Sequence, residues 1–74
     1  DALFQDDHGW TLVEFKTDRA RDRHALEALL EREDHVEQMR RYLVAVEHLL
    51  GERPRAVLCF LNVGRRVCQI RDRW

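Results

Sequence analysis

Glu14 and Lys16 are charged residues in a run, Trp10 to Lys16, that otherwise has the apolar and β-branched composition of a buried strand. Side chains alternate across a pleated strand, so this carboxylate and this ammonium share one face with Trp10 and Leu12. Burying an ion pair is costly unless its geometry and partners compensate for the lost hydration. The spacing therefore indicates a chemical role for the pair.

A second carboxylate is expected at the same place. The first five residues also have strand composition, and Asp6–Gly9 has the composition of a turn. A hairpin symmetric about this turn, with a loop of two or four residues, places Leu3 opposite Leu12. The same register places Asp1 opposite Glu14, with Cβ atoms roughly 4.5 to 5.5 Å apart. A divalent cation between the two carboxylates would turn their repulsion into attraction.

The kind of basic residue also singles out Lys16. Twelve of the thirteen basic residues are arginines, and Lys16 is the only lysine. An ammonium is a compact charge whose pKa shifts readily on burial, whereas a guanidinium is a planar fork that stays charged. This favours a chemical role for Lys16, although chance placement of a single lysine is the alternative.

Length and charge limit the class of protein. The 74 residues make one small domain, 1–74, and the lack of an initiator methionine suggests an excised fragment. No run resembles a signal peptide or a membrane span, so we expect a cytoplasmic protein without membrane contact. A formal net charge of −1 argues against a free-standing nucleic-acid binder. It leaves room for a catalytic module to which other domains deliver DNA.

The rest of the chain predicts an α/β fold. Leucines at helical spacing indicate one helix, and a longer apolar stripe that ends at Gly51 indicates a second. The continuously apolar run after Pro54 suits a central strand parallel to the Glu14 strand. We expect a small mixed sheet of about four strands with helices on one face, in the order β-β-α-α-β-β. The expected segments are a solvated loop at 17–23, helices at 22–32 and 34–50 with Asp34 as a cap, and strands at 55–61 and 66–70.

The cysteines and histidines do not have the spacing of a zinc site. If the final hairpin turns at 63–64, Cys59 faces Cys68, which allows a disulfide or, as expected in a cytoplasmic protein, two reduced thiols. The histidines are expected to be solvated, and they are His8, His24, His35 and His48.

Three features together resemble the PD-(D/E)xK nuclease superfamily, and more narrowly the RecB-like nuclease domains of UvrD/Rep-type helicase-nucleases. They are Asp1, the Glu14-Phe15-Lys16 motif with its Thr17-Asp18-Arg19 extension, and Gln38-x-x-x-Tyr42 on the following helix. The resemblance implies a truncated restriction-endonuclease-like core over nearly the whole chain.

The resemblance also implies a metal site. In that family the residues matching Asp1 and Glu14, with the backbone carbonyl of Phe15, hold Mg²⁺ or Mn²⁺. The residue matching Lys16 orients or activates the attacking water. Oxygen ligands suit such hard cations.

The remaining implied residues concern DNA. Those matching Gln38 and Tyr42 position the site or a DNA phosphate. Arg19, Arg21 and Arg23 leave the end of the Lys16 strand, where they could contact a phosphate backbone or form a solvated loop. The implied function is Mg²⁺-dependent DNA hydrolysis in end processing, recombination and repair, with the ATP-dependent helicase portion of the same polypeptide or complex as partner.

Two other functions stay open. One is an inactivated nuclease-like domain that binds DNA or braces a helicase. The other is a small interaction module whose open sheet edges pair with another chain, which in a fragment would appear as a concentration-dependent dimer.

Overall fold

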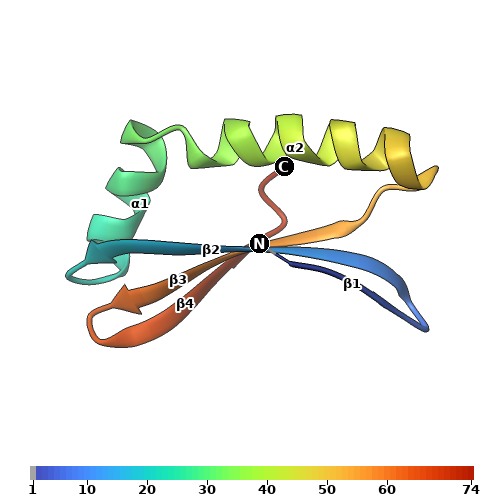
Figure 1. Ribbon diagram of the computed structural model, residues 1–74. Helices are drawn as coiled ribbons and strands as arrows, with labels where there is room; N and C mark the ends of the chain where they lie inside the picture. Colours follow the sequence, from blue (N-terminus) through green and yellow to red (C-terminus); the bar gives the residue numbers. More distant parts are fainter. Residues whose placement is uncertain (1) are drawn as a thin grey trace.

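The computed structural model describes residues 2–74 as two layers, a four-stranded sheet and two helices that lie over one of its faces (Figure 1). The strand order across the sheet is β1-β2-β3-β4. Both the α/β class and the order of elements along the chain agree with the prediction from sequence. The elements are β1 (Ala2–Asp6), β2 (Gly9–Ala20), α1 (Arg23–Arg32), α2 (His35–Leu50), β3 (Arg55–Val63) and β4 (Arg66–Arg71).

The first hairpin has the predicted register. β1 and β2 are antiparallel, with Leu3 opposite Leu12, and they are joined by a two-residue turn at 7–8. Of the two loop lengths considered, the shorter is the one observed. The prediction that Asp1 lies opposite Glu14 falls outside the described residues.

The centre of the sheet is the parallel pair of β2 and β3. Glu14 pairs with Leu58 and Lys16 pairs with Phe60, so the predicted parallel arrangement is confirmed. Parallel neighbours need a long crossover connection, and here α1 and α2 supply it. β4 returns antiparallel on the outer side of β3.

β2 is longer than expected. Residues 17–20 were predicted to be a solvated loop because they are polar, and that prediction is wrong. Arg19 pairs with Asn62 and Ala20 with Val63, after an irregularity in the register that follows Lys16. Pairing with β3 satisfies the backbone of this segment whatever its side chains are, which a composition argument does not detect.

The helix ends are set by local residues. Asp22 caps α1, because its Oδ1 accepts a hydrogen bond from the backbone N–H of Ala25 at 2.8 Å. Asp34 precedes α2 in a left-handed conformation, with φ of 59°, and makes no side-chain cap bond, so its predicted capping role is wrong. α2 ends at Gly51 with φ of 76°, a conformation that favours glycine.

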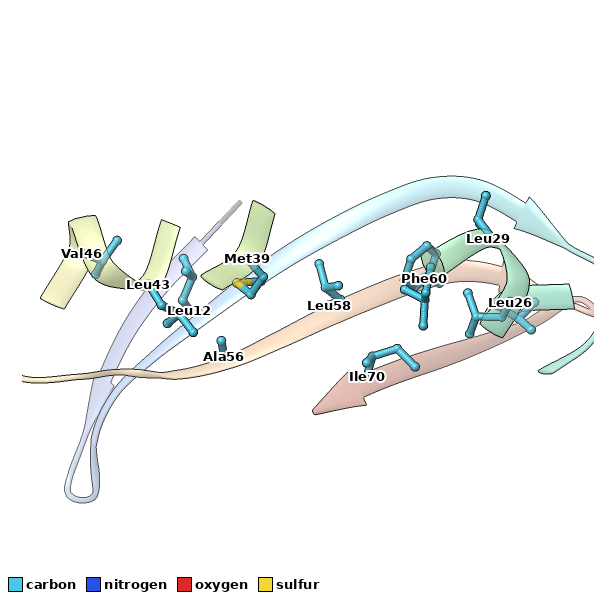
Figure 2. Packing of buried hydrophobic residues seen from close by; sticks show 12 residues of the cluster. Leu12, Leu26, Leu29, Met39, Leu43, Val46, Ala56, Leu58, Phe60 and Ile70 are labelled. Atoms are coloured by element: carbon cyan, nitrogen blue, oxygen red, sulfur yellow. The ribbon is translucent and has the colours of Figure 1, made fainter. Parts of the chain in front are cut away.

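The core lies between the helices and the sheet. Figure 2 shows Leu43 and Val46 of α2 close to Leu12 of β2, and Leu26 of α1 close to Phe60 and Ile70. Packing of one apolar helix stripe on one apolar sheet face explains why the helices sit where they do. The buried cluster consists of Leu12, Leu26, Leu29, Leu30, Met39, Leu43, Val46, Ala56, Leu58, Phe60, Val63 and Ile70.

The two cysteines are free and do not oppose each other. Cys59 pairs with Gln69, and Cys68 pairs with Phe60. The turn lies at 64–65, one residue later than assumed, and the register of β3 and β4 is irregular between Phe60 and Val63. A one-residue shift moves a side chain to the other face of a sheet, so the predicted facing of the cysteines is wrong.

Candidate active site

The candidate site is the ion pair in the middle of β2. Lys16 Nζ lies 3.3 Å from Glu14 Oε1, and the two side chains are 20% and 21% exposed. The pair occupies the helix-facing side of the strand, next to the fully buried Leu58 and Phe60 of β3. The prediction that both charges share one face is therefore confirmed. Their partial burial strengthens each charge's effect on a bound ion or phosphate, because solvent screens half-buried charges less.

On the β1 side, the pairing of β2 is described only as far as Val13. The pairing of β1 with β2 ends at Ala2 opposite Val13, so within the described residues β1 does not flank Glu14 and Lys16. β3 pairs with β2 on the other side throughout this stretch.

The chemistry of the donor set fits a hard cation in part. Within residues 2–74, no three His, Cys, Asp or Glu side chains gather closely enough to hold a metal ion. Glu14 supplies one carboxylate, and Mg²⁺ is commonly held by one or two carboxylates together with substrate phosphates and water. The second expected carboxylate, Asp1, is outside the described residues, and Phe15, whose carbonyl is the third expected ligand, lies between Glu14 and Lys16 on β2.

The predicted helix motif lies above the same strand. Tyr42 lines a cavity of about 120 Å³ together with Ala2, Leu3, Leu12 and Val46, which places it over the open end of the first hairpin. Its side chain is 44% exposed.

Gln38 is one helical turn before Tyr42, and it is exposed. At the start of α2, His35 lies 3.9 Å from Asp18, near the end of β2. Later in α2, Val46 lies near Leu12, closer to the beginning of β2. α2 therefore runs antiparallel to β2, and Gln38 lies at a level between these two anchors. Glu14 lies between the same anchors on the strand.

One residue of this region was missed from the sequence. His35 is 7% exposed, and both of its ring nitrogens are buried without a hydrogen-bond partner in the described residues. Its ring packs edge-on against Phe60, with centroids 5.6 Å apart, and its Nε2 is 3.9 Å from Asp18 Oδ2. The prediction that all histidines are solvated is therefore wrong for His35. The available signal was its helical spacing, since it is four residues before Met39 on the buried stripe.

Arg19 is exposed on β2, three residues after Lys16. It was expected on a loop, and it lies instead on a paired strand opposite Asn62. This fixes the backbone from which its side chain extends, three residues along β2 from Lys16.

A larger hollow lies away from these residues. Its volume is about 600 Å³, and it is bounded by α1, the start of α2 and Arg73 near the C-terminal end. It contains none of the residues predicted to form the site.

Comparison of the chain with protein-family models, curated proteins and solved structures finds no match. In the described part of the chain, none of the helices has both the length and the apolar character needed to span a membrane.

Proposed function

We propose that this chain is the core of a DNA nuclease domain that hydrolyses phosphodiester bonds with Mg²⁺ or Mn²⁺. The parent protein would be a RecB-like helicase-nuclease that processes DNA ends. The observation that carries the proposal is the half-buried Glu14–Lys16 ion pair on β2. It is supported by the register of the first hairpin, which is the one required to bring a second carboxylate to Glu14.

The proposed roles follow from the chemistry of each group. Glu14, Asp1 and the carbonyl of Phe15 would hold the cation, which when bound polarises the scissile phosphate and lowers the pKa of a bound water. The Lys16 ammonium would orient that water and stabilise the charge that develops on the phosphoryl oxygens. Gln38 and Tyr42 would contact the phosphate backbone from above.

The proposal predicts that Glu14→Gln and Lys16→Met each lower metal-dependent DNase activity about a hundredfold or more, because each removes a charge that acts on the transition state. Activity is measured on a labelled oligonucleotide in Mg²⁺. A Mn²⁺ titration monitored by calorimetry separates the metal-binding role of Glu14 from the role of Lys16. Glu14→Gln should weaken Mn²⁺ binding, whereas Lys16→Met should retain it.

A second ion pair supplies the matched control. Arg32 and Glu33 lie 3.5 Å apart on the exposed end of α1, so Arg32→Gln and Glu33→Gln should leave activity unchanged. Full activity in Lys16→Met would refute the catalytic assignment.

The second candidate function is an inactivated nuclease-like domain that binds DNA or braces a helicase. The specific observation in its favour is that the described residues bring no three metal-ligand side chains together. DNA binding without cleavage, combined with Mn²⁺ binding that does not respond to Glu14→Gln, would select this function.

A further inference from the structure

Two distant segments of the chain, each carrying two arginines, lie side by side at one end of the sheet. There the end of β2 adjoins the turn between β3 and β4 (Figure 1). The backbone N–H of Gly64 donates to the carbonyl of Ala20 at 2.8 Å, and a Cβ at Gly64 would lie 2.8 Å from the carbonyl oxygen of Arg21. We call this surface the arginine end, and it consists of Arg19, Arg21, Arg65 and Arg66.

The arginine end carries uncompensated charge. All four side chains are exposed, and within residues 2–74 none of them forms an ion pair. Asp22, the acidic residue next to Arg21, is engaged as the cap of α1. The opposite end of the sheet differs, because Arg53 lies 3.8 Å from Glu47 and Arg55 lies 3.6 Å from Asp6. The positive charge is therefore concentrated at one end although the net charge of the chain is −1.

The backbone conformation of the turn between β3 and β4 does not favour an arginine at position 65. Gly64 and Arg65 have φ of 59° and 67°, the left-handed pair of a two-residue hairpin turn. Such turns favour Asn and Gly, and a long side chain in this conformation is unfavourable. A residue kept against its local conformational preference points to a role for its side chain.

We infer that the arginine end binds the phosphate backbone of the DNA strand that reaches the Glu14–Lys16 site. The inference rests on the proposed function and names the surface along which its substrate lies. Arg19 follows Lys16 by three residues on one strand, a span of about 10 Å. Guanidinium groups match phosphate oxygens in shape and charge, and phosphate contacts position DNA without reading its sequence.

The test measures DNA binding by the 74-residue chain in EDTA. Binding to a labelled duplex and to a labelled single strand is monitored by fluorescence anisotropy. Each phosphate contact adds about 0.9 to the slope of log affinity against log salt concentration for duplex DNA. Arg65→Gln/Arg66→Gln should therefore reduce this slope by about two. Between about 50 mM and about 200 mM salt, the unsubstituted chain should lose about tenfold more affinity than the double variant.

Arg53→Gln/Arg55→Gln is the matched control, because it removes the same charge from the opposite end of the sheet. It should leave the salt slope nearly unchanged. Equal effects of the two double variants would overturn the inference, and so would a failure of the unsubstituted chain to bind either DNA.

Arg65→Gly distinguishes lost contacts from lost folding. Glycine suits the left-handed turn, so this variant should keep or raise the thermal midpoint while it weakens DNA binding. A rise in stability with unchanged DNA affinity would count against the inference. Because the assay contains no metal, its result is independent of hydrolysis. A chain that binds DNA through the arginine end in EDTA, but does not cleave it when Mg²⁺ is supplied, would refute only the nuclease proposal.

Discussion

Individual side chains depart from what packing alone would favour. Lys16 and Glu14 place charge on the helix-facing side of a strand whose neighbours there, Leu58 and Phe60, are fully buried. His35 places two unsatisfied nitrogens in the same layer, beside Asp18. Groups of this kind are uncommon in folded proteins, and a native structure that keeps them needs a reason for each.

His35 gives a prediction at this scale. His35→Leu should raise the free energy of unfolding by about 1 kcal/mol, because it removes buried polar atoms that have no partner and keeps the apolar contact with Phe60. Urea denaturation followed by circular dichroism measures the change. His48→Leu, on the exposed side of α2, should have little effect. A marked loss of stability in His35→Leu would show that the imidazole has a bound partner.

The elements are held together partly by a charged contact outside the core. Arg73 Nη1 and Nη2 donate to the two carboxylate oxygens of Glu27 at 2.6 and 2.7 Å, which fastens the C-terminal residues to α1. Hydrogen bonds from Arg73, and secondarily from Arg23, lower the pKa of Glu27 from 4.5 to about 2. The paired geometry of a guanidinium and a carboxylate favours this contact over a simple surface ion pair.

This contact predicts an acid dependence of folding. A carboxylate whose pKa is lower in the folded state contributes stability above its unfolded pKa of 4.5 and loses it as the pH falls toward about 2. Arg73→Gln should therefore remove part of the acid-sensitive stability in this window. NMR titration should then show the pKa of Glu27 closer to its ordinary value. Arg32→Gln is the control, and an unchanged Glu27 titration in Arg73→Gln would contradict the assignment.

The stability of the whole molecule depends on one small hydrophobic core between the helices and one face of the sheet. Only one face of the sheet is covered by helices in the described chain, and Phe15, Leu61 and Val67 are exposed large apolar side chains of its strands (Figure 1). A domain of this size has little stability in reserve. The proposed dimer through sheet edges remains a prediction for solution measurements.

This small core makes a clear prediction for Phe60, which is fully buried on the central strand β3. Phe60→Ala should cost about 3 to 5 kcal/mol, which is comparable to the total stability expected of a small domain. The variant should therefore lack a cooperative thermal transition by circular dichroism. Leu49→Ala, at a position that is 86% exposed, should melt like the unsubstituted chain. A cooperative transition near the original midpoint in Phe60→Ala would contradict the proposed importance of this layer.

The sequence by itself determined the order of the elements along the chain and the register of the first hairpin. Periodicity is a local property, so it placed Glu14 and Lys16 on one face and identified both helices and the parallel central pair. The tertiary structure alone decided which polar segment became strand, which histidine was buried and which arginines lie at the same end of the sheet. Residues 17–20 became strand because β3 offered them backbone partners, and Gly64 came against the carbonyl of Arg21 because the last hairpin turns there. Such contacts join residues far apart in the chain, and local composition and periodicity do not specify them.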